Sequence, residues 1–145
     1  MKGENTHVNW SVNGYRMPTE AEWEYAAKGG PEQKSYEYSG SDELDEVGWC
    51  NENAGNRTQP VALKRPNTMG LYDMSGNVWE WCWDRYGKYP SAEQTNPKGP
   101  DTGPNRVLRG GSWDYNPQYC RVADRSFFTP GSRVGSTGFR LARNL

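Results

Sequence analysis

Three cysteines and one histidine are the residues of this chain that could support nucleophilic or redox chemistry. Cys50, Cys82 and Cys120 form no Cys-x-x-Cys motif and are odd in number. A zinc site and a disulfide framework are therefore not expected, although a single disulfide could form. His7 lies in a polar segment with no evident partner, so Ser–His and Cys–His catalysis are not expected.

Oxygen-bearing side chains offer a second kind of chemistry, the binding of a cation. Asn77, Glu80 and Asp84 occur within one short tryptophan-rich stretch. Carboxylate and amide oxygens are the ligands that Ca²⁺ prefers in proteins. The same oxygens could instead accept hydrogen bonds from loop amides. The residues alone leave both alternatives open.

Segment 106–141 alternates between two kinds of position. Some look fixed by folding, and among these we expect Trp113, Arg121, Arg125, Arg133 and Phe139 to hold the backbone rigid. The others mix small, polar and aromatic residues without helical or strand periodicity. A rigid frame that carries irregular, aromatic-rich loops is typical of a binding surface. The candidate ligand-binding residues are Asp114, Tyr115, Asn116, Gln118, Tyr119, Asp124, Ser126, Phe127, Phe128, Thr129, Gly131, Ser132, Val134, Gly135 and Ser136.

The charge pattern of this segment favours a structural use of arginine. From Arg106 onward the chain contains seven Arg and no Lys. Spaced arginines brace loops through forked hydrogen bonds to carboxylates and carbonyls. The net charge of −1 and the pI of about 5.9 provide no field that would attract nucleic acid. Nucleic acid is therefore not an expected partner.

The composition predicts one loop-rich domain with an aromatic core. The chain has 145 residues, the size of a single domain spanning 1–145. Its mean hydropathy is −1.07, yet it contains seven Trp and nine Tyr, so rings must replace aliphatic side chains in the core. Seventeen Gly and ten Pro favour turns. No apolar run is long enough to span a membrane, and the start of the chain does not resemble a signal peptide.

One helix is clearly predicted, from Thr19 to Gly29. Thr19 is the expected N-cap, Glu22 completes a capping box, and Gly29 follows the C-terminus. The expected inward face consists of Trp23, Ala26 and Ala27, and the expected solvated face includes Glu20 and Glu24.

Two strands are predicted from alternation with period two. Trp79, Trp81 and Trp83 alternate with polar residues, and a shorter alternating strand covers 138–142. We expect the 138–142 strand to pair with Val107–Leu108, and the residues after Gly110-Gly111-Ser112 to be strand-like. Segments 31–70 and 85–105 are expected to be loops.

Four motifs together resemble the formylglycine-generating enzyme (sulfatase-modifying factor) family. They are GYRMPTEAEWEYAA (14–27), GLYDMSGNVWEW (70–81), RGGSW (109–113) and GFR (138–140). The resemblance implies an α+β C-type lectin fold, loop-rich with short helices and small antiparallel sheets. It also implies a structural calcium site to which Asn77, Val78 and Glu80 would contribute. The family's domain begins earlier, so this chain resembles its C-terminal portion or a minimal form of it.

The resemblance does not extend to the family's catalytic cysteines. The enzyme binds Cu(I) through a Cys-x4-Cys pair that follows the Gly-Gly-Ser motif. Here Cys120 occupies the second position, but Tyr115 occupies the first. A phenol cannot replace a thiolate as a ligand of Cu(I), a soft ion. Neither Cys50 nor Cys82 is close enough in sequence to suggest a substitute, so oxidase activity is not expected.

The tail is also similar to the variable proteins of diversity-generating retroelements, which share this fold. In those proteins adenine-directed errors in Asn codons cannot produce Lys, Glu, Gln, Met or Trp. Between Trp113 and Gly138 the chain contains no Lys, Glu, Met or Trp, and Gln118 is the one exception to the rule. Segment 106–141 is therefore the expected variable region.

Positions that vary freely must be exposed, because burying a Phe contributes about 1.5–3 kcal/mol to stability. We therefore expect Tyr115, Tyr119, Phe127 and Phe128 to form an exposed aromatic patch that contacts a partner. The alternative is that these four rings belong to the core.

The sequence thus favours a non-enzymatic protein that displays a diversified binding surface. It would need no cofactor, apart from a possible structural calcium. Its partner would be a protein or cell-surface ligand. The protein itself would be located on a cell surface or a phage particle. The alternatives are an oxidase of the formylglycine-generating type with altered cysteines, and a fixed lectin-like module that binds carbohydrate through Ca²⁺.

Overall fold

The computed structural model describes residues 8–32 and 34–144, which form the loop-rich α+β structure expected from the composition. The helices are α1 (Glu20–Ala27) and α2 (Leu44–Val47), and the 3₁₀ turns are η1 (Gly30–Glu32) and η2 (Pro117–Cys120). The strands are β1 (Tyr15–Arg16), β2 (Gly48–Trp49), β3 (Ser75–Gly76), β4 (Trp79–Arg85), β5 (Arg106–Arg109), β6 (Arg125–Phe128), β7 (Thr137–Gly138) and β8 (Ala142–Arg143).

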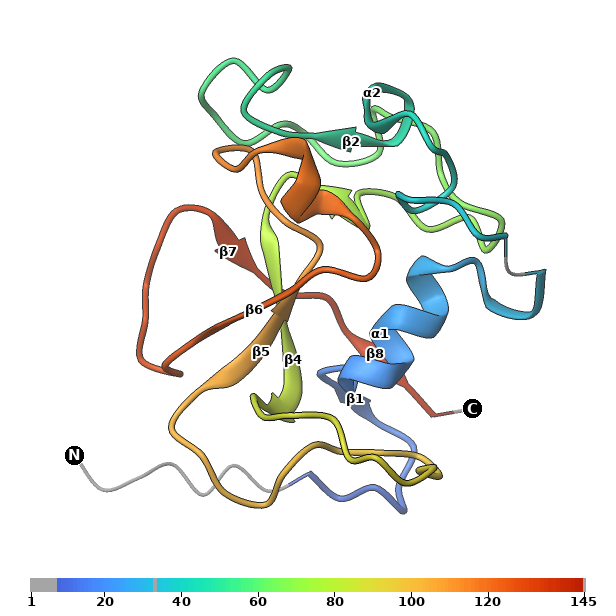
Figure 1. The fold of residues 1–145 in the computed structure, drawn as a ribbon, viewed down its shortest axis with the longest axis vertical. Helices are drawn as coiled ribbons and strands as arrows, with labels where there is room; N and C mark the ends of the chain where they lie inside the picture. The colour runs from blue at the N-terminus through green and yellow to red at the C-terminus, as the bar shows by residue number, and fades with distance from the viewer. Residues whose placement is uncertain (1–7, 33, 145) are drawn as a thin grey trace.

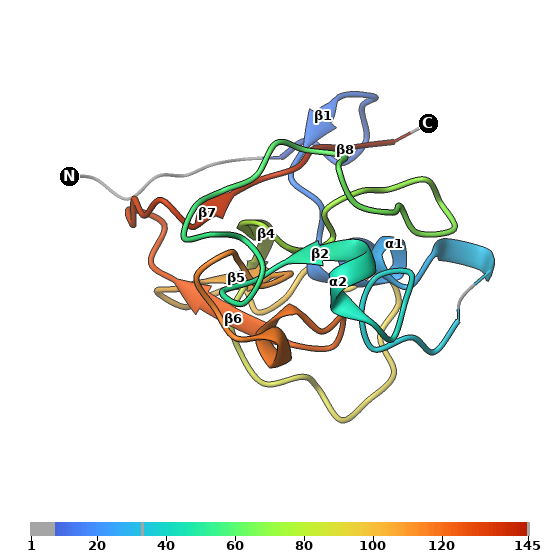
Figure 2. The ribbon, with the colours of Figure 1, turned by 90° about the horizontal axis from the view of Figure 1, so that it is seen from above.

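A four-stranded sheet with the order β6-β5-β4-β7 lies at the centre of the molecule (Figure 1). The central strand β5 is antiparallel to both β4 and β6, whereas β7 runs parallel to β4. The helix α2 and strand β2 lie at one end, and the 86–105 connection lies at the opposite end. Figure 2 looks down onto α2 and β2.

The pairing expected for the C-terminal tail is wrong. Val107–Leu108 pairs with Phe127 and Ser126 of β6, so that edge of β5 is already occupied. The tail instead crosses to the other side of the sheet, where β7 pairs with β4 and β8 pairs with β1. The ion pair between Arg140 and Glu80 fixes it there, with Nε and Nη2 of the arginine 2.6 and 2.7 Å from the two carboxylate oxygens.

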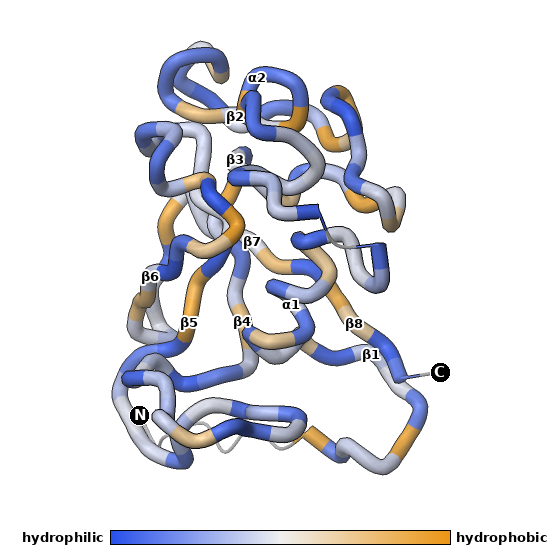
Figure 3. Tube along the Cα trace, turned by 45° about the vertical axis from the view of Figure 1, so that its right-hand side comes forward, coloured by the Kyte–Doolittle hydropathy of each residue, from blue (hydrophilic) through white to orange (hydrophobic). Residues whose placement is uncertain are grey.

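Helix α1 begins and ends as its sequence predicts. The Thr19 side chain accepts from the Glu22 amide while the Glu22 carboxylate accepts from the Thr19 amide, which completes the capping box. Trp23 and Ala27 are buried against β4 and β5. Figure 3 shows that hydrophobic stretches are few and that one of them follows β5. The Trp23 indole also donates to Glu80 Oε2 at 2.7 Å, so rings and polar groups share the core.

The expectation that Glu20 and Glu24 form a solvated face is wrong. Glu20 is 4% exposed, and its carboxylate receives two hydrogen bonds from Arg125 at 2.8 and 2.6 Å. Arg109, which is fully buried, lies 3.4 Å from Glu20 and also pairs with Glu24. A buried guanidinium requires carboxylate partners. We call Glu20, Glu24, Arg109 and Arg125 the ion network, which joins α1 to β5 and β6.

Replacing the buried arginine of the ion network should strongly destabilise the fold. Arg109→Met leaves Glu20 and Glu24 with less charge compensation, and we expect the free energy of unfolding to fall by about 3 kcal/mol or more. The matched control is Arg133→Met at an exposed position, which should change it by less than about 0.5 kcal/mol. Urea unfolding followed by tryptophan fluorescence measures both. Equal effects would contradict the importance of the network.

Candidate functional site

The first half of the predicted variable segment is shaped by Gly111. Its φ of +74° lies in the left-handed region, and a Cβ at this position would come within 2.6 Å of Cys120 Sγ and 2.7 Å of the Tyr119 carbonyl oxygen. Glycine is therefore required where the backbone passes close to η2. After it the chain forms a turn and η2, so the expected strand-like continuation is wrong.

Three aromatic rings pack edge to face next to this turn. Tyr115 meets Trp79 edge to face at 5.6 Å between ring centroids, and Tyr119 meets Tyr115 in the same way at 5.4 Å. The amide of Asn51 donates to the Tyr115 carbonyl, and its side chain donates to Asn116 Oδ1. The tyrosines are thus supported by residues outside segment 106–141.

The second half contains a strand where no regular periodicity was expected. Residues Arg125–Phe128 form β6, whose side chains alternate between the two faces of the sheet. Phe127 packs against Tyr86 on the side of α1, with ring centroids 4.4 Å apart. Phe128 lies on the opposite face, since it follows Phe127. The four aromatic residues expected in one patch are therefore divided. Tyr115 and Tyr119 lie near Trp79, Phe127 lies near Tyr86, and Phe128 lies on the other face of the sheet.

The loop that follows β6 returns to the same tryptophan. Thr129 and Ser132 are joined through their hydroxyl groups at 3.0 Å. The Ser136 carbonyl accepts from the Trp79 amide at 2.8 Å, and Ser136 itself is 9% exposed. Trp79, which is 2% exposed, thus contacts both Tyr115 and Ser136, which are 21 positions apart in the predicted variable segment.

Most of the candidate ligand-binding residues reach solvent. Ser136 is buried. Five are half-buried, namely Tyr115, Asp124, Ser126, Phe128 and Ser132. Nine are exposed, namely Asp114, Asn116, Gln118, Tyr119, Phe127, Thr129, Gly131, Val134 and Gly135.

The expected frame is only partly the one that the structure shows. Arg125 is held by the ion network, and Trp113 is half-buried. Arg121 is exposed, but its Nε donates to the Gln118 carbonyl at 2.8 Å and so braces η2 as expected. Arg133 and Phe139 are exposed and form no such bond within the described residues, so the expectation is wrong for these two. The buried residues of this part of the chain include Arg109, Ser112, Cys120 and Val122.

The structure brings together two cysteines that are far apart in sequence. Cys50 and Cys120 belong to one buried cluster with Tyr38 and Val47, and they are 2% and 0% exposed. Burial, followed by the proximity of Cys50, raises the pKa of the Cys120 thiol to about 12. Both thiols are free, and Cys82 is a third buried free thiol. Because Cys50 and Cys120 are 70 positions apart in the sequence, their proximity was not predicted.

The side chains proposed for calcium have other partners. Glu80 is engaged by Arg140 and Trp23, and the amide of Asn77 exchanges two hydrogen bonds with the Gln59 backbone. Val78 offers only its backbone carbonyl as a ligand. Within residues 8–32 and 34–144, no three His, Cys, Asp or Glu side chains group in a way that could hold a metal ion. The side-chain oxygens of Asn77 and Glu80 are thus already engaged, and the calcium site stays a prediction of the resemblance.

One oxygen near this stretch does lack a partner. Oδ1 of Asp73 is buried without a hydrogen bond, while its Oδ2 accepts from the Ala62 amide at 2.8 Å. Asp73 also helps to raise the pKa of Arg140, after the larger effect of Glu80. Sequence reasoning did not select Asp73, although it lies in the same motif as Asn77.

This arrangement of short strands, a capped helix and long loops is the C-type lectin fold in the form found in formylglycine-generating enzymes. The model of the sulfatase-modifying factor enzyme 1-like domain family matches residues 2–145. The chain belongs to this family.

Individual relatives include both enzymes and a variable protein. The formylglycine-generating enzyme of Streptomyces coelicolor is 43% identical over 164 residues, which cover 95% of this chain and 52% of the relative. The structure of Treponema denticola variable protein 1 is similar with a TM-score of 0.87 and 42% identity, over 93% of this chain and 49% of that chain. The serine/threonine-protein kinase pkn1 of Chlamydia pneumoniae is 39% identical over 147 residues, 99% of this chain and 23% of the kinase.

The chain spans about half the length of the formylglycine-generating enzyme and the variable protein that it matches. No helix in the described part of the chain is long and apolar enough to cross a membrane.

Asp84, the third oxygen donor singled out in the sequence, caps α1. Its Oδ2 accepts from the Glu20 amide at 2.7 Å, and the residue is 3% exposed. Burial raises the pKa of this carboxyl from 3.8 to about 6. Between these pH values the folded state holds the proton more tightly than the unfolded state. The stability that Asp84 contributes is therefore present at low pH and is lost as the pH rises through about 6.

Asp84→Asn should remove this pH dependence, because the amide oxygen can still accept from the Glu20 amide. Relative to the unsubstituted chain, the variant should become more stable on going from about pH 4 to about pH 7, by up to about 3 kcal/mol. Urea unfolding at both pH values measures the difference. A stability difference that does not change with pH would show that Asp84 titrates normally.

Proposed function

We propose that this protein is a non-enzymatic binding protein whose segment 106–141 forms a diversified binding surface. One observation carries the proposal. Fourteen of the fifteen candidate positions are exposed or half-buried, Ser136 being the exception. Arg109 and Ser112, which precede them, and Cys120 and Val122, which lie among them, are buried. The similarity to Treponema denticola variable protein 1 supports the same function.

The energetics of burial explain why such an alternation suits diversification. Tyr119 and Phe127 are 39% and 42% exposed, so a change of side chain there removes only part of a ring's buried area. A fully buried ring or valine contributes about 1.5–3 kcal/mol, a large share of a domain's stability. Positions such as Val122, at 4% exposure, could not vary without endangering the fold.

The loops are supported by residues that do not need to vary. Arg125 and Glu20 fix the start of β6, the backbone amide of Asn51 holds the Tyr115 carbonyl, and Trp79 holds the Ser136 carbonyl. A loop whose backbone is held in one conformation loses less entropy on binding. The surface would therefore be preorganised, and its mix of aromatic and polar side chains suits a protein or cell-surface ligand.

Calcium remains a prediction of the resemblance. Because Glu80 already has a bidentate partner in Arg140, we propose that the fold does not require the ion. If calcium binds, Asp73 Oδ1 is the oxygen whose missing partner it would supply.

Substitutions at exposed positions of the variable segment should leave the fold intact. We expect the combined change of Gln118, Tyr119, Thr129 and Val134 to Ala to lower the free energy of unfolding by less than about 1 kcal/mol. The matched control, Val122→Ala alone, should lower it by about 2 kcal/mol. Urea unfolding measures both variants. If the fourfold variant is the less stable one, these side chains serve the core.

The DNA beside the gene provides an independent check on diversification. A reverse transcriptase gene and a near-repeat of the 106–141 coding segment that is rich in AAC codons would support it. Their absence, together with a tolerant surface, would instead favour a fixed lectin-like module.

An oxidase of the formylglycine-generating type is the second candidate, since the enzyme of that name from Streptomyces coelicolor is 43% identical and Cys50 lies in the same cluster as Cys120. Two observations weigh against it. Both thiols are almost fully buried, and the pKa of Cys120 at about 12 leaves it protonated at neutral pH. A thiolate is the form that binds copper and reacts.

The native protein should therefore neither bind Cu(I) nor oxidise a sulfatase peptide. We expect no saturable binding in a Cu(I) titration. We also expect no oxidation of a cysteine-containing sulfatase peptide when the reaction is monitored by mass spectrometry. A formylglycine-generating enzyme assayed in parallel is the positive control. Turnover that is lost in Cys120→Ser or Cys50→Ser would replace our proposal with the oxidase.

A further inference from the structure

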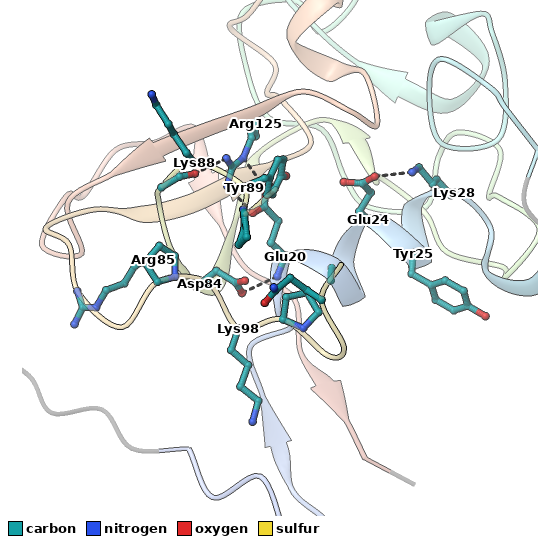
Figure 4. Close-up of a pocket in the computed structure, with 17 residues that line it drawn as sticks. Glu20, Glu24, Tyr25, Lys28, Asp84, Arg85, Lys88, Tyr89, Lys98 and Arg125 are labelled. Atoms are coloured by element: carbon teal, nitrogen blue, oxygen red, sulfur yellow. Dashed lines mark hydrogen bonds and ion pairs between the residues drawn. The ribbon is translucent and has the colours of Figure 1, made fainter. Parts of the chain in front are cut away.

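A pocket of about 790 Å³ lies between helix α1 and the segment 84–100, outside the loops described above (Figure 4). Its lining comes from one face of α1, from the start of β6 and from the proline-rich connection that follows β4. That connection forms the end of the molecule opposite to α2 (Figure 1), whereas Tyr115 is bonded to Asn51, close after β2. The pocket is thus separate from the site around Trp79.

The charged residues at its base are already engaged. The Glu20 carboxylate is held by Arg125 and accepts from the Tyr89 hydroxyl at 3.0 Å. Asp84 accepts from the Glu20 amide, and Glu24 is paired with Lys28 at 2.6 Å and with Arg109. The acids of the pocket are therefore not free to recruit a cationic ligand.

The wall carries an aromatic ring that is fixed and yet reaches solvent. Tyr89 is 62% exposed, although its hydroxyl is bonded to Glu20 and its ring lies 4.2 Å from the Arg125 guanidinium carbon. Pro97 and Pro100 also line the pocket, whereas the ring of Tyr25, which is 46% exposed, extends away from Tyr89 (Figure 4). A ring that is held in place but left exposed is available to stack on a ligand at little cost in entropy.

The remaining charges of the lining are positive. Arg85, Lys88 and Lys98 belong to the pocket, and within the described residues none of them forms an ion pair with a carboxylate. Arg85 donates to the Gly103 carbonyl, and Lys98 lies over the Trp10 ring at 4.3 Å. In Figure 4, Lys88 and Lys98 extend on different sides of the pocket. Cations without acidic partners next to an apolar cavity favour an anion.

We propose that this pocket is a second ligand site, which takes a ring-shaped apolar group that carries a negative charge. The ring would lie against Tyr89 and the prolines, and the anion would face the uncompensated cations at the rim. Because this lining includes only Arg125 from the variable segment, the site would be the same in every diversified form.

The test uses two naphthalenes that differ in charge, 2-naphthoate and neutral 2-naphthamide. We expect saturable binding of 2-naphthoate by calorimetry and NMR, at least about tenfold tighter than 2-naphthamide at low salt. Ala21→Trp should abolish binding, because Ala21 is an exposed helix residue that lines the pocket. Ala92→Trp, an equally bulky change at an exposed position of the same connection outside the lining, should bind as before.

The charge requirement is tested separately. Lys88→Glu combined with Lys98→Glu should weaken 2-naphthoate by about tenfold or more and leave 2-naphthamide unchanged. Lys34→Glu, at an exposed lysine outside the pocket, should change neither affinity. Equal affinity for the two probes, no saturable binding of either, or binding that survives Ala21→Trp would each overturn the proposal. None of these results depends on whether segment 106–141 is diversified.

Discussion

The buried ion network between α1 and the sheet is the interaction on which the rest of the structure depends. Arg109 is fully buried, a position that a guanidinium can occupy only with carboxylates beside it. Glu20 and Glu24 supply them, and Arg125 shares Glu20. This network joins three segments that are distant in sequence. In a chain with few aliphatic residues, it specifies how α1 lies on the sheet where hydrophobic packing alone would be less selective.

The same network explains how irregular loops can be supported without contributing to the core. The backbone of β6 is fixed at Arg125, and η2 is fixed by the close approach of Gly111 to Cys120. Between these points Ser112, Cys120 and Val122 are buried and Tyr115 packs against Trp79, whereas most of the other side chains reach solvent. The supports lie mainly outside the segment or at its buried positions. Of the exposed residues that the sequence pattern suggested, Arg121 contributes through its bond to the Gln118 carbonyl, whereas Arg133 and Phe139 do not.

Features determined by neighbouring residues were predictable from the sequence, and features determined by distant ones were not. The capping box of Thr19 and Glu22 and the period-two pattern of β4 depend on contacts over a few residues, and both are confirmed. The burial of Glu20 depends on Arg125, 105 positions away, so helical periodicity assigned it to solvent. The proximity of Cys50 to Cys120 and the pairing of the tail with β4 escaped prediction for the same reason.

Arg125 shows how the proposed variable surface and the proposed pocket could share one strand. Its guanidinium lies against the rings of Tyr86 and Tyr89 and is bound to Glu20, on the side of the sheet that faces α1. The residues that follow it alternate between faces, so Ser126 and Phe128 point away from the pocket. A change at those two positions alters one face only, whereas a change at residue 125 would disturb the ion network, the pocket and the backbone of β6 together. The need for charge compensation inside the fold thus separates the position that must stay constant from those that can vary.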